Sequence, residues 1–538
     1  MKKQILGMWL ALLVFLSAVY VVEVNDMSEA DGITIDQDVL RRIRASIQAT
    51  YTVFSSGGTT YAKSNVPGGT DYEDVDANCG SVINDALSAM SDGGILLLRE
   101  GTFVIGSTGL VVAHDGTTIM GSGMGTIVQF TKATGVDDYT IKIEEKDNCR
   151  VTNFKILGQL GDGNHGIFIY GSSKFMIDHM WISGVGEESI FVLRKGTTWC
   201  RDGIIANNLI EGAGDGAIEL NYGSQFITIA NNVVRDCDAK GVLPGGAGIR
   251  LVGDATYTVE DNTVVGNIVE ECQRGINIAG YVHDNVIADN VFTNNAGVGI
   301  RLYDGGGAGS PTYNLITGNL VKDNGSHGVY VQDASSYNDF LNNKIMDNTG
   351  YGVYVLDSTC VDNVVKGNTF SGNSTAPYLS ASTTTKLACI NLPLVAAHTF
   401  LSADGNSWGA EIDANTEYAI FAGSLPPHVH RVAYMIIKAV GLAAPGAGNA
   451  MNLQIDGYGG ADDEAEGTET ITIATKKSVT DNTAVNDYIQ WLINASDDAD
   501  IDDLAGGDTV QIKVQHDAAA GGDIATDAVF QTVEVYYV

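Results

Sequence analysis

The sequence has little positive charge, little proline and no closely paired cysteines. Its 538 residues include 30 Lys and Arg against 65 Asp and Glu, a formal net charge of −35. No basic stripe is available to neutralise phosphates, which excludes nucleic-acid binding. Only 8 Pro accompany 65 Gly. Many short strands joined by Gly, Asn and Asp turns produce this composition, whereas a helical enzyme does not.

Near the N-terminus, residues 5–22 contain no charged side chain and follow Lys2 and Lys3. The run is close to the ~20 residues that span a bilayer. It predicts a retained membrane anchor, with a cleaved signal peptide as the alternative. Either interpretation places the rest of the chain outside the cytosol. We assign residues 1–30 to this hydrophobic helix and residues 31–75 to a stalk or capping segment.

From about residue 151 two short apolar strands recur in a fixed order. The first begins as VTNFKI at 151–156 and ends as VKGNTF at 365–370, with copies 23 to 35 residues apart. The second reads GIFI at 166–169 and GVYV at 352–355. The last seven copies of the first strand carry Asn at the fourth position: Asn208, Asn232, Asn267, Asn290, Asn319, Asn343 and Asn368.

This period predicts an all-β rod, a right-handed parallel β-helix over residues 76–385. Each coil would bury alternate apolar side chains and pair with the next coil, ~4.8 Å away. The seven Asn would form a ladder of amides while adopting the left-handed turn conformation. Cys237 and Cys272 each follow a ladder Asn by five residues. They are expected on adjacent coils, either bonded or stacked as small apolar side chains.

The repeat ends after Ser380, and residues 390–538 contain at least seven strand-like runs separated by turns. They predict a C-terminal antiparallel β-sandwich of the jelly-roll type. Acidic runs at 462–466 and 497–503 could bind calcium through clustered oxygens, or could be solvated loops. No other cofactor or metal is expected.

A short helix at 84–90, then GGILLLREGTFVI at 93–105 and GTTIMGSGMGTIVQF at 116–130, precede the coils. This order resembles the pectin lyase-like β-helix superfamily, including viral tailspikes and receptor-binding spikes, over about residues 75–380. The resemblance implies binding or degradation of surface polysaccharide. The family's catalytic motifs are incomplete here, because Gly214-Asp215-Gly216 has one Asp and Ser326-His327-Gly328 lies four coils further on. His179 occupies a turn position and is interpreted as structural.

The middle residue of each second strand is expected to point outward, and aromatic side chains in register can stack on sugar rings while Arg and Asn bind hydroxyls or carboxylates. These positions predict a glycan-binding face, although contact with a neighbouring subunit would use the same side chains. Asp215 and Glu219 are a candidate acid and base or nucleophile pair. The simpler alternative is an ion pair between Glu219 and Arg250. The predicted ligand-binding residues are Phe168, Phe191, Arg250, Asn277, Arg301, Tyr330 and Tyr354.

Three functions are compatible with these features. The first is a membrane-anchored homotrimeric spike or adhesin, on a virion or cell surface, that binds a polysaccharide or glycoprotein. The second is an exported polysaccharide lyase or glycoside hydrolase that uses Asp215 and Glu219. The third is a structural cell-surface protein. The incomplete catalytic motifs favour the first.

Overall fold

The computed structural model describes residues 49–382, except 76–77, 107–108, 132–137, 161–162, 238–245 and 308, together with the backbone of strands between 386 and 537. The expected N-terminal helix and the expected calcium-binding loops at 462–466 and 497–503 lie outside the described residues. Within the described part of the chain, no helix is long and apolar enough to cross a membrane.

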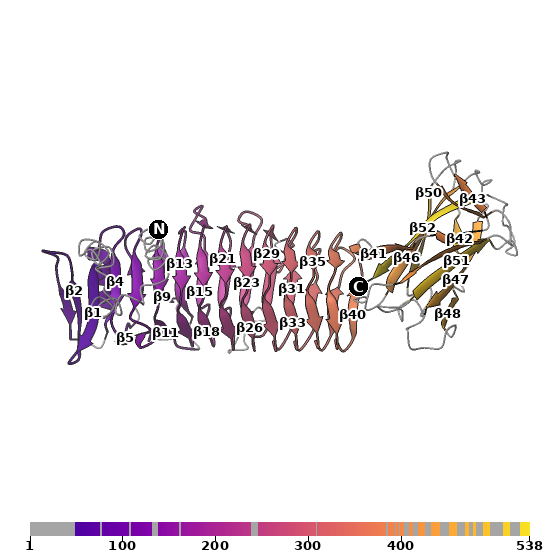
Figure 1. The fold of residues 1–538 in the computed structure, drawn as a ribbon. Coiled ribbons are helices and arrows are strands. Elements are labelled where there is room, and N and C mark those ends of the chain that lie inside the picture. The colour runs from indigo at the N-terminus through magenta and orange to yellow at the C-terminus, as the bar shows by residue number, and fades with distance from the viewer. Residues whose placement is uncertain are drawn as a thin grey trace, which may run out of the picture.

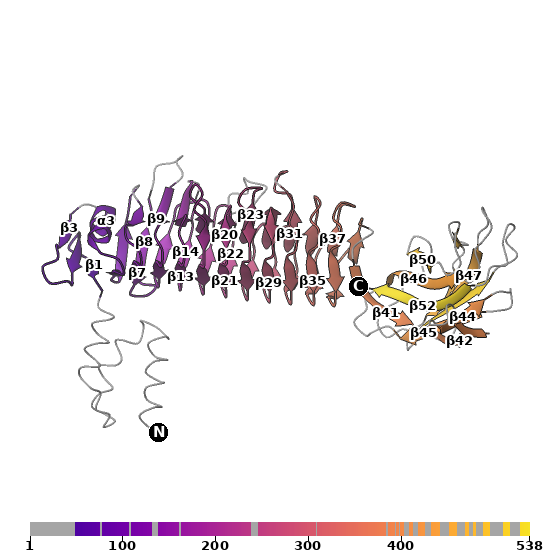
Figure 2. The same cartoon turned by 90° about the horizontal axis from the view of Figure 1, so that it is seen from above.

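The central part of the chain is a right-handed parallel β-helix, as predicted (Figures 1 and 2). Each coil contributes one strand to each of three long parallel sheets, which we call sheets A, B and C. Inward side chains such as Ile156, Ile210 and Val321 are fully buried and form a continuous core along the rod. Because each coil buries its apolar face only against its neighbours, the stack is stable as a whole and not coil by coil.

The strands of sheet A in the rod are β4 (Ile95–Leu98), β7 (Thr118–Gly121), β10 (Arg150–Thr152), β13 (Met176–Asp178), β17 (Ile204–Ala206), β21 (Thr228–Ala230), β25 (Thr263–Val265), β29 (Val286–Ala288), β32 (Leu315–Thr317), β35 (Asp339–Leu341) and β38 (Val364–Lys366). Sheet B is 11-stranded and comprises β5 (Gly101–Val104), β8 (Thr126–Gln129), β11 (Lys155–Leu157), β14 (Trp181–Ser183), β18 (Leu209–Glu211), β22 (Val233–Arg235), β26 (Ile268–Glu270), β30 (Val291–Thr293), β33 (Leu320–Lys322), β36 (Lys344–Met346) and β39 (Thr369–Ser371).

Sheet C is also 11-stranded and comprises β6 (Leu110–Val112), β9 (Asp138–Glu144), β12 (Asn164–Tyr170), β15 (Ile190–Leu193), β19 (Ile218–Asn221), β23 (Ile249–Gly253), β27 (Ile276–Gly280), β31 (Ile300–Tyr303), β34 (Val329–Val331), β37 (Tyr351–Val355) and β40 (Ala376–Ser380). A short fourth sheet joins β16 (Cys200–Arg201), β20 (Ser224–Gln225), β24 (Val259–Glu260) and β28 (Val282–His283).

The N-terminal end of the rod carries strands β1 (Tyr51–Ser56), β2 (Thr59–Ser64) and β3 (Tyr72–Asp74) and helix α3 (Gly80–Ala89). β1 pairs antiparallel with β2 and parallel with β4, so it continues sheet A beyond the first coil. Asn78 Oδ1 accepts a 2.9 Å hydrogen bond from Gly80 N at the start of α3. The helix buries Val82, Ile83 and Leu87 over the open end of the core.

The predicted asparagine ladder is present and fully buried. Asn319 Nδ2 donates to Asn343 Oδ1 at 2.9 Å, and Asn319 Oδ1 accepts from both the backbone and the side chain of Asn290, at 2.9 and 3.0 Å. The same contacts continue in both directions from Asn208 to Asn368. Each amide therefore ties three successive coils together at one corner of the rod.

Two further ladders were not predicted from the sequence. One lies before sheet A, and its amides bond from each coil to the next: Asn262, Asn285, Asn314, Asn338 and Asn363. The other follows sheet B: Asn295, Asn324, Asn348 and Asn373. All three corners in this part of the rod are thus fixed by hydrogen-bonded amides.

The expected left-handed conformation of the ladder Asn is wrong. The left-handed residue is the one immediately before each ladder position, for example Asn207 (φ 57°) before Asn208 and Asn342 (φ 54°) before Asn343. Gly266 (φ 67°) takes this place before Asn267. Turning the chain one residue earlier leaves the ladder side chain pointing inward, where it reaches the next coil.

Cys237 and Cys272 are stacked on adjacent coils without a disulfide. Gln273 N donates to Cys237 O at 3.2 Å across the coil boundary, and both thiols are free and buried. The contact with Cys272 and burial hold the pKa of Cys237 well above its usual range. The pair replaces two amides of the ladder after sheet B with small apolar side chains.

Beyond the rod, strands lie at the seven strand-like runs of the sequence: β45 (Tyr418–Ser424), β46 (Val432–Gly441), β47 (Met451–Gly459), β48 (Glu469–Thr472), β50 (Tyr488–Asn494), β51 (Thr509–His516) and β52 (Ala528–Tyr537). Five further strands were not predicted: β41 (Lys386–Leu392), β42 (Leu394–Ala397), β43 (Thr399–Ser402), β44 (Trp408–Ile412) and β49 (Lys477–Val479). Their pairings with one another are antiparallel, as in β46 with β52 and β45 with β51. Face-to-face packing as a jelly-roll sandwich stays a prediction.

Replacing Asn319 by Ala should lower the free energy of unfolding by about 3 kcal/mol or more, because several buried donors and acceptors lose their partners at once. Urea unfolding followed by circular dichroism measures the loss. Lys344→Ala, at an exposed position of β36, is the control and should change stability by no more than about 0.5 kcal/mol. Equal effects of the two substitutions would contradict a stabilising ladder.

Candidate functional site

The outward column of sheet C is in register from coil to coil, as the sequence predicted. Backbone pairing places Phe168 beside Phe191, Arg250 beside Asn277 and Tyr330 beside Tyr354. The side chains of the column are not equally accessible. The complete column, in order along the rod, is Val111, Lys142, Phe168, Phe191, Glu219, Arg250, Asn277, Arg301, Tyr330, Tyr354 and Leu379.

At the N-terminal side, aromatic rings form one stack. The rings of Phe168 and Phe191 are 5.3 Å apart and nearly parallel, and the ring of His165 lies 4.9 Å from that of Phe191. Tyr170 extends the stack at 5.1 Å from Phe168, and Lys142 Nζ lies over the Tyr170 ring at 5.6 Å. We call these residues the first aromatic cluster. His165 was not predicted from the sequence, although it directly precedes the repeated second strand of its coil, as His327 does further along the rod.

Directly beside this cluster, three carboxylates surround one guanidinium. Arg250 Nη1 lies 2.7 Å from Asp215, 2.9 Å from Glu219 and 3.8 Å from Glu188. Glu219 and Arg250 come from the neighbouring strands β19 and β23, whereas Asp215 and Glu188 lie in the segments that lead into β19 and β15. We call these four residues the acid–arginine cluster.

The structure therefore brings the predicted pair Asp215 and Glu219 together around Arg250. The expectation that Glu219 and Arg250 form a surface ion pair is wrong in one respect, because Glu219 is only 2% exposed. Asn277, predicted to bind ligand on the exposed face, is also fully buried, between the strands of Arg250 and Arg301.

Two of the three carboxyl groups, those of Glu219 and Glu188, differ in protonation. Burial raises the pKa of Glu219 to about 8, and the charges of Glu188 and Asp215 add to this while Arg250 opposes it. Burial also opposes ionisation of Glu188, but His165, 2.9 Å away, and Arg250 together hold the pKa of Glu188 below its usual range. A neutral carboxylic acid thus lies beside an ionised carboxylate, an arrangement suited to acid–base chemistry.

Further along the column lies a second aromatic cluster. The rings of Tyr330 and Tyr354 are stacked at 5.5 Å, and His327 and Tyr351 each lie 4.9 Å from the Tyr354 ring. His327 Nδ1 accepts a 3.0 Å hydrogen bond from Tyr351 N, and burial lowers the pKa of His327. The imidazole is therefore neutral near pH 7 and carries its proton on Nε2. Arg301, on the next strand, completes this end of the face.

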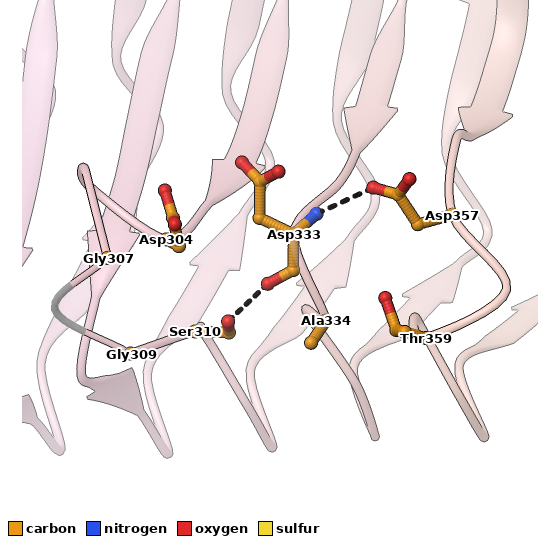
Figure 3. Close-up of a pocket in the computed structure, with 8 residues that line it drawn as sticks. All are labelled: Asp304, Gly307, Gly309, Ser310, Asp333, Ala334, Asp357 and Thr359. Carbon is orange, nitrogen blue, oxygen red and sulfur yellow. Dashed lines mark hydrogen bonds between the residues drawn. The ribbon is translucent and has the colours of Figure 1, made fainter.

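A polar cavity of about 490 Å³ opens where the strands of sheet C end (Figure 3). Asp304, Asp333 and Asp357 from three successive coils form one side, and Ser310, Ala334 and Thr359 lie opposite them. Asp333 N donates to Asp357 Oδ2 at 2.9 Å. A hydrogen-bond chain from Arg301 through Gln332 to Asp333 connects the cavity with the second aromatic cluster.

His179 is structural, as predicted. It has a left-handed backbone (φ 53°) at the corner between sheets A and B, and its Nδ1 lies 2.7 Å from Asp178. Asp178 is held mainly by Arg150, whose Nη2 donates at 2.6 Å. The motif Gly214-Asp215-Gly216 and His327 lie on β19 and β34 coils, four coils apart, so they do not form one site.

Among the described residues, the one group of three or more side chains close enough to hold a metal ion is Glu187, Glu188 and Asp215. Their oxygens are ligands for hard cations such as calcium or magnesium, and Arg250 already neutralises Asp215. The six described cysteines are all buried. Among the described residues, the group of side chains placed to hold a metal ion therefore contains neither His nor Cys, the nitrogen and sulfur ligands suited to copper.

The coils, ladders and stacked outward column define a pectin lyase-like β-helix protein. The family model described as "Periplasmic copper-binding protein (NosD)" matches residues 104–387, which is more than half of the chain. The chain belongs to this NosD family. No curated protein matches it significantly.

Solved structures with the same type of fold include the A-module of the Azotobacter vinelandii mannuronan C-5 epimerase AlgE4 (18% identity, 56% of this chain and 86% of that chain, TM-score 0.41). The tailspike gp49 of Acinetobacter baumannii bacteriophage Fri1, a capsular polysaccharide depolymerase, has 12% identity over 84% of this chain and 83% of its own, with a TM-score of 0.37. An alginate lyase from Paenibacillus has 18% identity over 55% and 95%, also with a TM-score of 0.37.

The protonation of Glu219 makes stability depend on pH. Between its ordinary pKa of 4.5 and its folded pKa of about 8, the folded state holds a proton that the unfolded state has lost. Stability should therefore fall by about 1.4 kcal/mol per pH unit from this group as pH rises through that range. Glu219→Gln should remove this slope. The free energy of unfolding of the variant, measured in urea, should therefore rise relative to that of the wild type between pH 5 and pH 8.

Glu270→Gln, at a half-buried position of β26 on sheet B, is the matched control and should follow the wild-type pH profile. Parallel profiles for Glu219→Gln and the wild type would contradict a protonated Glu219.

Proposed function

We propose that the protein is an exported β-helical rod that binds a surface polysaccharide along sheet C. The observation that carries the proposal is the pair of stacked aromatic clusters on one flat face, with Phe191 and Tyr330 five strands apart. At the strand spacing this corresponds to about 24 Å, enough for several sugar rings. Rings at both ends would stack on sugars, and Arg301 would bind hydroxyls or carboxylates between them.

An extracytosolic location is consistent with the family description, which names a periplasmic protein. The spike form of the proposal adds a membrane anchor at residues 5–22, association into a homotrimer and a C-terminal β-sandwich that contacts a receptor at the tip. The shaft would then hold the binding surfaces away from the membrane.

Copper, which the family description names, is not part of the proposal. The clustered metal-ligand side chains of the described chain are carboxylates. The stacked thiols of Cys237 and Cys272 are buried, and the contact with Cys272 together with burial raises the pKa of Cys237 well above its usual range. Soft or imidazole ligands are what copper selects.

Cleavage of the bound polysaccharide is the second candidate function, and the acid–arginine cluster favours it. A neutral Glu219 could donate a proton to a leaving oxygen, and the ionised carboxylate of Glu188, or the carboxyl group of Asp215, could act as base or nucleophile. Glu219 is nearly inaccessible, so its surroundings would have to open for substrate to reach it.

Binding is tested by affinity electrophoresis in gels that contain capsular or alginate-type polysaccharide. Replacing Tyr330 and Tyr354 together by Ala should weaken retardation by about tenfold or more, because two stacking rings are lost. Ile268→Ala, at an exposed apolar position of sheet B, is the control and should bind like the wild type. Unchanged retardation, or a change of molecular mass that reveals these rings in a subunit contact, would contradict the proposed face.

Cleavage is tested by following chain length of acidic and neutral polysaccharides with time. If the enzyme hypothesis is correct, Glu219→Gln should abolish depolymerisation while leaving retardation in the gel unchanged. Equal shortening by the variant and the wild type would exclude Glu219 as the acid. If neither protein shortens the polysaccharide and both still bind it, the result would support binding and exclude cleavage.

A further inference from the structure

A second exposed aromatic pair lies away from sheet C, at the corner that precedes sheet A. The rings of Tyr313 and Tyr337 are stacked at 5.2 Å and 15° on adjacent coils. Tyr313 is 58% and Tyr337 43% exposed. Folding does not require these rings, because they contribute little to the core.

Both tyrosines also have an unfavourable backbone. Tyr313 (φ 57°) and Tyr337 (φ 58°) are left-handed, a conformation that costs a bulky side chain about 1–2 kcal/mol. At the same corner, other coils place Asp261, Asp284 and Asp362, a residue type that tolerates this conformation. Two successive coils thus have a strained backbone at this corner, and each places an exposed phenol ring there.

Hydrogen bonds between coils fix the backbone from which the two rings project. Each tyrosine precedes an amide of the buried ladder, and Asn314 Nδ2 donates to Asn338 Oδ1 at 3.0 Å. Tyr337 N donates to Val361 O of the next coil at 3.0 Å. A platform fixed in this way loses little conformational entropy when a ligand binds.

A cavity of about 300 Å³ lies along this pair. Leu315, Asp339 and Val364 from three successive strands of sheet A line it together with Tyr313 and Tyr337. Its lining repeats along the rod axis every ~4.8 Å, which suits an extended chain that repeats along its own length. Apolar walls with a few polar groups are typical of ligand sites.

We propose that this groove binds a neutral glycan chain, at a site separate from the sheet C face. Tyr313 and Tyr337 supply the apolar surface on which pyranose rings pack, and the carboxylate of Asp339 accepts hydrogen bonds from hydroxyls. The charged residues that line the groove are acidic, Asp339 and Asp362. A polyanionic chain is therefore disfavoured here, unlike on sheet C, where Lys142 and Arg301 lie in the aromatic column.

The test is affinity electrophoresis of the full chain in gels containing a neutral polysaccharide, hydroxyethyl cellulose or glucomannan. The double variant Tyr313→Asn and Tyr337→Asn should lose retardation by about tenfold or more, yet unfold at a higher urea concentration, because Asn relieves the backbone strain. Tyr337→Phe keeps the ring and should retain binding.

Phe226→Asn is the matched control. Phe226 is also left-handed (φ 55°) and 52% exposed at the same corner, but it lies three coils away from the groove. It should gain stability without a change in retardation. The proposal is overturned if the double Asn variant still binds, or if the wild type is retarded by neither neutral polysaccharide. It is also overturned if the double variant has a different molecular mass in solution from the wild type, because the groove would then be a contact between copies of the chain. Variants of Tyr330 and Tyr354 should leave this binding unchanged, so it fails or holds independently of sheet C.

Discussion

The rod depends on buried side-chain amides that hydrogen-bond from each coil to the next. An Asn in such a ladder satisfies its own polar atoms, the backbone of the coil below and the backbone of its own corner, as Asn319 does with Asn343, Ile287 O and Thr317 O. An unpaired amide at the same depth would be costly. The ladders therefore fix the position of each corner, and with it the register of every outward side chain. The aromatic clusters on sheet C are consequences of that register.

A fixed register also explains how the acid–arginine cluster can exist. Three carboxyl groups around Arg250 are nearly removed from water, and burial of this kind is destabilising unless the charges are closely paired. A rigid stack can support the cost because its core is continuous along the rod. A buried polar cluster that does not stabilise the fold is a good candidate for a functional site. The strained pair Tyr313 and Tyr337 meets the same criterion on another side of the rod.

Much of the fold was predictable from the sequence because each repeat of about 25 residues corresponds to one coil of the rod. The seven-Asn ladder and the outward column could be predicted from spacing alone, because residues at the same place in successive repeats lie side by side on neighbouring coils. The other two ladders were missed because Cys237 and Cys272 interrupt one of them and the other has only five members. The left-handed residue was misplaced by one, because several ladder positions are preceded by another Asn, such as Asn231 before Asn232, and both tolerate turns.

The site was only partly predictable. Asp215 and Glu219 are close in sequence, so their proximity was expected, but the burial of Glu219 was not, because this residue belongs to the outward column of sheet C. His165 approaches Glu188 from a neighbouring coil, and the spacing of the repeat alone did not indicate this contact. The most direct test of the account is a structure of the rod with a bound oligosaccharide of its polysaccharide ligand. We expect sugar rings over Phe168 and Phe191 or over Tyr330 and Tyr354 on sheet C. A sugar on sheet B, or a second chain covering these rings, would contradict it.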